Sequence, residues 1–211
     1  MTPGDLVAEH WLGTEVRCYP GRIRTIVEAL DRAVESFPER TALETPEGDV
    51  TYRELAELVE GATERLADEG LVAGDRLAVC LRNGLDIVVA IWACARARLV
   101  FVGLSTRLQS PQWAFMLRHS GSQLALAHPE LLDGLRTAGA EAGLPEGAIR
   151  DVGDHLTGRR SSWRGAEVPF PDQDETYGVI YTSGTTGQPK ASQVAHRCTM
   201  HSAIAYVRTF S

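Results

Sequence analysis

A run of residues near the end of the sequence combines hydroxyl groups, glycines and a cation in one short stretch. Backbone N–H groups can fold around phosphate oxygens where a glycine removes the Cβ atom. Ser and Thr hydroxyls add donors, and a lysine adds a mobile positive charge. The run therefore has the composition of a phosphate-binding loop, and its residues are Thr182, Ser183, Gly184, Thr185, Thr186, Gly187, Gln188, Pro189 and Lys190.

This run is not a Walker A loop. That motif needs glycine directly before the lysine and Ser or Thr after it, whereas Gln188 and Pro189 precede Lys190 and Ala191 follows it. A generic Ser/Thr/Gly turn between strands has a similar composition. From composition alone, both interpretations stay open.

Other residues whose side chains could take part in catalysis or metal binding are better explained by structural roles. Histidines 196 and 201 follow the loop on a predicted helix, without an evident partner, and a structural or solvent-facing role is favoured for both. Trp92 and Trp113 are expected to be packing aromatics. The acidic cluster Asp172, Asp174 and Glu175 is interpreted as a solvated loop rather than a metal site, because no donor pattern accompanies it.

The elements that must position the loop follow from the hydrophobic pattern. Helices are predicted by apolar residues on one face, and Thr51 with Glu54 forms a capping-box signature. A Ser110-Pro111 pair places a capping residue before a proline at the first helical position. The predicted helices are 26–37, 51–70, 85–97, 110–121, 130–140 and 196–210, and the predicted strands are 41–43, 77–81, 99–102, 124–126 and 177–182.

Alternating strands and helices predict an α/β fold with a mainly parallel sheet flanked by helices. Residues 1–22 have weak periodicity and are expected to form an extended lead-in, followed by one domain over 23–211. Residues 141–175 are rich in glycine, proline and charge, and mainly loop is expected there.

Composition narrows the class of protein. The 211 residues are 44% hydrophobic and 23% charged, which suits a globular core, and the net charge of −7 disfavours a nucleic-acid binder. The cysteines at 18, 80, 94 and 198 have no zinc or dithiol spacing, and Cys80 and Cys94 lie in apolar runs. The sequence predicts neither a secretory signal nor a transmembrane segment, and a cytoplasmic location is expected.

The string from Tyr181 to Lys190 resembles the signature phosphate loop of the adenylate-forming (acyl-CoA synthetase, AMP-binding) enzyme superfamily. The resemblance continues upstream and covers most of residues 24–210 in the expected order. It is carried by Leu43, by Thr51-Tyr52-Arg53-Glu54-Leu55, by Gly74-Asp75-Arg76-Leu77-Ala78-Val79, by Asn83, and by Val100-Phe101-Val102 through Arg107-Leu108. The sequence departs from the pattern at Gly103, Ser105 and Ala191, and Ala191 indicates ordinary backbone there, such as a short strand.

This resemblance implies a function. A carboxylic acid would attack the α-phosphate of Mg-ATP to give an acyl-adenylate, and CoA would then take the acyl group, as in fatty acid metabolism. The expected phosphate contacts are Thr182, Ser183, Gly184, Thr185, Thr186, Gly187 and Lys190, with Thr182 as the candidate Mg²⁺ contact. The family's adenylation lysine lies outside this sequence, so the chain is expected to be the first part of the N-terminal AMP-binding domain and inactive alone.

Two alternatives remain within these expectations. The chain could come from an adenylation domain of a peptide synthetase, which loads a carrier protein, or it could be a nucleotide-binding module without catalysis. The expected partners are a carboxylic acid, ATP and CoA. The acid itself cannot be read from these residues, and a homo-oligomer stays open.

Overall fold

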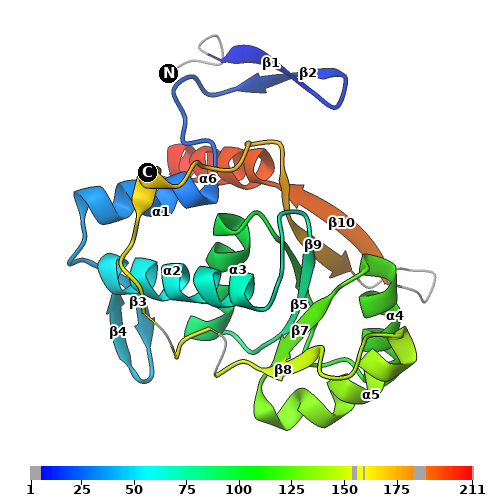
Figure 1. The fold of residues 1–211 in the computed structure, drawn as a ribbon. Coiled ribbons are helices and arrows are strands. Elements are labelled where there is room, and N and C mark those ends of the chain that lie inside the picture. Colours follow the sequence, from blue (N-terminus) through cyan, green and yellow to red (C-terminus); the bar gives the residue numbers. More distant parts are fainter. Residues whose placement is uncertain (1–5, 154–155, 159, 183–188, 211) are drawn as a thin grey trace.

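The computed structural model describes residues 6–153, 156–158, 160–182 and 189–210, which form three layers around one central sheet (Figure 1). This sheet has six strands in the order β10-β9-β6-β5-β7-β8. All neighbouring strands are parallel except β10, which is antiparallel to β9. Its strands are β5 (Arg76–Cys80), β6 (Val100–Gly103), β7 (Leu124–Ala127), β8 (Ile149–Asp151), β9 (Thr176–Thr182) and β10 (Lys190–Ala195). The predicted fold class is confirmed.

Helices cover both faces of the sheet, as continuous apolar strands require. In β5, Leu77 and Val79 pack on one side with α1, α2 and α3, while Ala78 and Cys80 pack on the other with α4 and α5. The α6 helix joins α1 and α3 through Met200. The helices are α1 (Ile26–Ser36), α2 (Tyr52–Asp68), α3 (Leu85–Arg96), α4 (Ser110–Ser120), α5 (Leu132–Ala142) and α6 (His196–Phe210).

Two hairpins stand outside the central sheet. The predicted extended lead-in contains β1 (Val7–Trp11) and β2 (Thr14–Cys18), which pair with each other beside α6 (Figure 1). A second hairpin joins β3 (Thr41–Thr45) to β4 (Gly48–Thr51), directly before α2. Short 3₁₀ turns occur at η2 (Pro129–Leu131) and η3 (Gly165–Glu167).

The starts of α2 and α4 test the capping residues that the sequence predicts. The capping box of α2 is confirmed, because Thr51 Oγ1 accepts from Glu54 N at 3.2 Å and Glu54 Oε2 accepts from Thr51 N at 2.9 Å. At α4 the predicted cap was one residue too late. Gln109 occupies the cap position, its N–H donates to the Gln112 side chain at 3.2 Å, and Ser110 is already helical.

The segment after α5 was predicted to be mainly loop, and the structure corrects this in part. Residues Ile149–Asp151 form β8 at one edge of the sheet. The strand was missed because three residues are too few to show a period. From there the chain crosses the face of the sheet that α1, α2 and α3 cover, and reaches β9, the second strand from the other edge (Figure 1).

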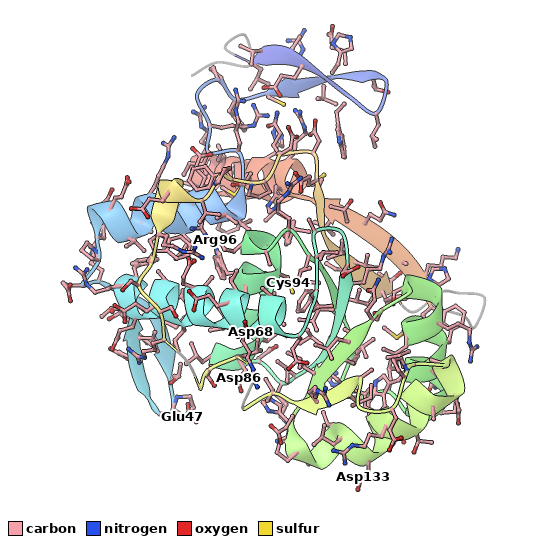
Figure 2. All side chains as sticks on the ribbon, in the orientation of Figure 1. Glu47, Asp68, Asp86, Cys94, Arg96 and Asp133 are labelled. Atoms are coloured by element: carbon pink, nitrogen blue, oxygen red, sulfur yellow. The ribbon has the colours of Figure 1, made fainter. Side chains whose placement is uncertain are left out.

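A buried charge cluster holds this crossing segment in place. Glu60 of α2 and Arg96 of α3 form an ion pair of 3.4 Å with side chains 0% and 1% exposed. Arg164 Nε donates to Glu60 Oε1 at 2.6 Å, and Arg96 Nη2 donates to the Gly165 carbonyl at 2.9 Å. Trp163 stacks on the Arg96 guanidinium at 4.5 Å from the ring centroid. Figure 2 labels Arg96 beside the core residue Cys94 on the same helix.

A side chain at Gly165 would force its neighbours to move. Its φ is +50°, and an added Cβ would lie 2.5 Å from Asp31 Oδ1, the atom that accepts the Trp163 indole N–H. We predict that Gly165→Ala lowers the free energy of unfolding by about 2–4 kcal/mol, since left-handed backbone strain and overpacking add up.

Gly121→Ala is the matched control, because Gly121 has φ +68° and open space around the Cβ position. It should cost only the backbone strain of about 1–2 kcal/mol. Urea denaturation measures both values, and equal losses would show that the Asp31 contact contributes nothing.

Candidate functional site

The two ends of the candidate loop lie opposite each other. Strands β9 and β10 form an antiparallel hairpin in which Lys190 pairs with Thr182. Residues 183–189 connect them, so the loop closes this hairpin. Ala191 lies inside β10, which confirms the strand expected there. The predicted contacts Ser183, Gly184, Thr185, Thr186 and Gly187 lie outside the described residues.

The loop end of the hairpin lies at the carboxyl edge of the parallel strands. Strand β9 runs parallel to β6, with Val179 paired to Val102, and β6 runs parallel to β5. In open α/β sheets, ligands bind outside the carboxyl ends of the strands. The loop between Thr182 and Lys190 therefore leaves the sheet on the side where this fold class binds ligands.

Lys190 is the strongest candidate for binding an anion. It is the only lysine in the sequence, and its side chain is exposed. Within the described part of the chain it makes no ion pair and no side-chain hydrogen bond. Thr182, across the hairpin, is also exposed. An exposed ammonium group and an exposed hydroxyl group thus lie at the two ends of the loop.

The opposite end of the hairpin is held by ion pairs. Arg98, which follows α3, donates to both carboxylate oxygens of Glu175 at 2.9 and 3.0 Å. Arg197 of α6 donates to both oxygens of Asp174, at 2.5 and 3.0 Å. Two members of the predicted acidic cluster are therefore structural partners of arginines. Among the described residues, no group of acidic, His and Cys side chains could hold a metal ion.

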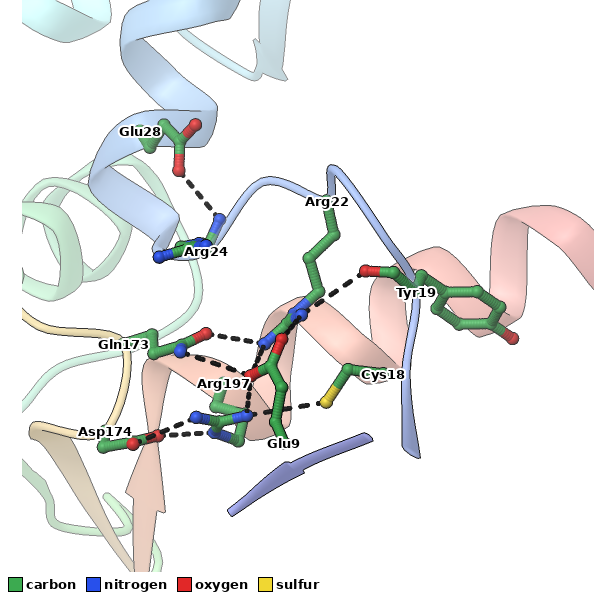
Figure 3. A network of polar contacts seen from close by, with 9 residues as sticks. All are labelled: Glu9, Cys18, Tyr19, Arg22, Arg24, Glu28, Gln173, Asp174 and Arg197. Carbon is green, nitrogen blue, oxygen red and sulfur yellow. Dashed lines mark hydrogen bonds and ion pairs between the residues drawn. The ribbon is translucent and has the colours of Figure 1, made fainter. Parts of the chain in front are cut away.

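The N-terminal hairpin joins this network through Glu9 (Figure 3). Its carboxylate accepts from Arg22 at 2.6 and 2.8 Å and from Arg197 at 2.5 Å. Hydrogen bonds from Arg22, against the cost of burial, lower the pKa of Glu9 to about 2. Sequence reasoning missed Glu9, Arg22 and Arg197 as a group, because residues so far apart in the chain give no local pattern.

The histidines and tryptophans have packing roles. His196 is 1% exposed, stacks on Tyr177 with centroids 4.7 Å apart, and its Nδ1 accepts from the Ile26 N–H at 3.4 Å. His201 stacks on a tyrosine of the N-terminal segment at 5.2 Å. The indole N–H groups of Trp92 and Trp113 donate to backbone carbonyls at 3.2 and 3.0 Å.

The cysteines predicted in apolar runs are core residues. Cys80 and Cys94 are both fully buried. Burial raises the pKa of Cys80 to about 12 and raises that of Cys94 as well. Neither is a nucleophile at neutral pH. In the part of the chain that the structure describes, no helix is long and apolar enough to cross a membrane.

Known proteins share this fold. A solved structure of o-succinylbenzoate CoA synthetase (MenE) from Bacillus subtilis, in complex with the acyl-adenylate intermediate OSB-AMP, matches with a TM-score of 0.74 and 28% identity. The match covers 86% of this chain and 46% of that one. The three-layer arrangement is that of the N-terminal domain of adenylate-forming enzymes.

The chain belongs to the AMP-binding enzyme family, whose model matches residues 30–210. Tyrocidine synthase 2 of Brevibacillus parabrevis is 30% identical over 173 residues, covering 82% of this chain and 4% of that protein. The long-chain-fatty-acid–CoA ligase FadD13 of Mycobacterium tuberculosis is 30% identical over 176 residues, covering 80% of this chain and 34% of that protein. This chain therefore spans about a third or less of these curated relatives.

The buried His196 gives the stability of the fold a pH dependence. Burial lowers its pKa from 6.5 to about 4, against the raising effect of Glu175 and Asp172. Between these values the unfolded chain binds a proton that the folded chain does not. The titration of His196 therefore leaves the free energy of unfolding unreduced above pH 6.5 and lowers it progressively as the pH falls toward 4.

We predict that lowering the pH from 7 to 5 reduces the free energy of unfolding through His196 by about 2 kcal/mol. Urea denaturation of the wild type and His196→Asn at both pH values measures this, and the variant should lack that loss. His201→Asn, on the same helix, should keep it. An unchanged pH dependence in His196→Asn would refute the attribution.

Proposed function

We propose that this chain is the ATP-phosphate-binding part of an AMP-forming ligase that activates a carboxylic acid as an acyl-adenylate and passes the acyl group to CoA. The observation that carries the proposal is the exposed Lys190, which has no side-chain partner among the described residues and lies opposite Thr182 at the ends of a glycine-rich loop on the carboxyl edge of the sheet. Family membership and similarity to two CoA ligases support it.

In this proposal the loop does the work of positioning. Lys190 offsets the negative charge of the β- and γ-phosphates, and the hydroxyls and backbone N–H groups of Ser183, Gly184, Thr185, Thr186 and Gly187 orient their oxygens. Thr182 would hold Mg²⁺ through its hydroxyl group. The metal, when bound, offsets charge on the phosphates, so that a carboxylate can approach the α-phosphate against less repulsion.

The chain alone is expected to bind ATP without completing adenylation. In the family that the sequence resembles, the lysine that carries adenylation is not the lysine of the phosphate loop. Lys190 is the only lysine here and belongs to the loop. The resemblance thus leaves no residue of this chain for that step.

A carrier protein is a second possible acceptor of the acyl group, and a specific similarity supports it. Tyrocidine synthase 2 matches this chain as well as FadD13 does, at 30% identity. A peptide-synthetase adenylation domain would pass the acyl group to a carrier protein instead of CoA. Both alternatives share the adenylation step and differ only in the thiol.

Having a single lysine allows a direct test of the ATP site. Mg-ATP should slow the reaction of Lys190 with an amine-reactive acylating reagent about tenfold or more, because a phosphate-bound ammonium is shielded. Peptide mass spectrometry quantifies the label, with the α-amino group as internal reference. Tripolyphosphate should protect Lys190 and adenosine should not.

Calorimetry tests the same site through variants. We predict that Lys190→Ala weakens Mg-ATP binding at least tenfold, more at low salt because the contact is ionic. Ser192→Ala, a neutral exposed change two residues along β10, should leave it within twofold. No protection and no effect of Lys190→Ala would contradict the proposed phosphate site.

The reaction needs the longer protein expected to carry this chain. ATP–pyrophosphate exchange with a panel of carboxylic acids should occur there, and should be absent with the 211 residues alone. Thioester formation with CoA, rather than with a carrier protein, would support the first acceptor. Exchange with no acid at all would leave a nucleotide-binding module without catalysis.

A further inference from the structure

The loop end of β9 extends beyond the strand that supports it. Pairing between β9 and β6 covers residues 178–180 and ends where Ile180 meets Gly103. Tyr181 and Thr182 continue past that point, and the strand they pair with there is β10. Strand β10 is the outermost strand, and its first four residues are exposed. The sheet therefore gives little support to the tip of the hairpin.

Tyr181 supplies a contact that the sheet lacks at this point. Its hydroxyl donates to the Met116 carbonyl at 3.2 Å and lies 2.9 Å from His119 Nδ1. Both partners belong to α4, which packs on the sheet through Met116 and Leu117. The Ser120 side chain of the same helix also hydrogen-bonds Tyr181, so the end of β9 is tied to α4 through this one tyrosine.

The chemistry of these groups defines how the contact works. The Met116 carbonyl can only accept, so the single hydroxyl proton of Tyr181 points to it, and the hydroxyl oxygen accepts from His119 in its Nδ1–H form. The His119 ring meets the Tyr181 ring edge-on at 5.8 Å and stacks on Phe115 at 5.4 Å, which holds it in place. Partial burial raises the pKa of Tyr181, so the hydroxyl remains a donor at neutral pH.

We propose that Tyr181 is a positioning residue for the phosphate loop, which it holds at its entry by hydrogen bonds to α4, with His119 as its partner. This inference rests on the proposed function. Tyr181 does not touch the phosphates itself. It sets the direction in which the chain leaves the sheet at Thr182, at the entry to the phosphate loop.

Strand β9 offers a matched control for this role. Tyr177 lies near the other end of the strand, where its hydroxyl is 2.7 Å from Thr199 Oγ1 of α6. Tyr177→Phe and Tyr181→Phe are the same change in the same strand, and each removes one hydroxyl group and its hydrogen bonding. A purely structural role would make the two variants equivalent in ligand binding.

The experiment is calorimetric titration of the 211-residue chain with Mg-ATP, with urea denaturation of each variant as the check on folding. Tyr181→Phe should bind Mg-ATP about five- to tenfold more weakly, because the entry of the loop loses its hydrogen bonds to α4. Tyr177→Phe should stay within twofold of the wild type. His119→Ala keeps the tyrosine and should weaken binding about threefold, which provides a second test should Tyr181→Phe fold poorly.

The possible results separate the two proposals. If Lys190→Ala loses binding while Tyr181→Phe and His119→Ala bind like Tyr177→Phe, the positioning role is wrong and the phosphate site stands. If the wild-type chain does not bind Mg-ATP, the proposed function is wrong for this chain and the positioning role falls with it. Loss of binding in Lys190→Ala, together with weaker binding in Tyr181→Phe and His119→Ala and wild-type binding in Tyr177→Phe, supports both.

Discussion

The route of the chain depends on one buried ion pair. Glu60 and Arg96 face each other without contact with water, and a buried charge that loses its partner typically costs about 3–5 kcal/mol. The pair alone leaves hydrogen-bonding groups of both side chains without partners. Arg164 and the Gly165 carbonyl complete the cluster. The crossing segment must therefore lie over α2 and α3, and this path leads from β8 at one edge of the sheet to β9 beside β6.

That route determines where the candidate site lies. Because β9 pairs in parallel with β6, the loop after it leaves at the carboxyl edge of the sheet. The start of β9 is clamped by Arg98 and Arg197, and the N-terminal hairpin is tied to the same clamp through Glu9. At the other end, Thr182 and Lys190 are exposed, and among the described residues no ion pair or side-chain hydrogen bond holds them. A base held by ion pairs, with an exposed hydroxyl and an exposed ammonium group at the other end, suits the phosphate-binding role that we propose for this hairpin.

The sequence predicted those features whose causes are local. The start of α2 follows from Thr51 and Glu54, three residues apart, and the alternating faces of β5 follow from a continuous apolar run that needs cover on both sides. The position of the loop between two strands was also predicted. Its role came from resemblance to a family and not from geometry, since composition left a plain turn equally open.

What the sequence did not predict depends on contacts between distant residues. Glu60 and Arg96 belong to helices whose apolar residues define their faces, and no spacing shows that these two charges meet. Arg197 reaches Glu9 across 188 positions. Strand β8 is only three residues long and is specified by its place beside β7. Tyr181 is recognisable in the sequence as part of a motif, whereas its hydrogen bonds to α4 join residues that only the fold brings together.

We propose that ATP phosphates bind at the loop between β9 and β10. Backbone amide NMR of the 23.0 kDa chain, titrated with Mg-ATP, tests it most directly. Shift changes should concentrate at residues 182–190 and at Tyr181, and should be small at Tyr177 and His196 near the base. Changes centred elsewhere on the sheet, or none at saturating Mg-ATP, would contradict it.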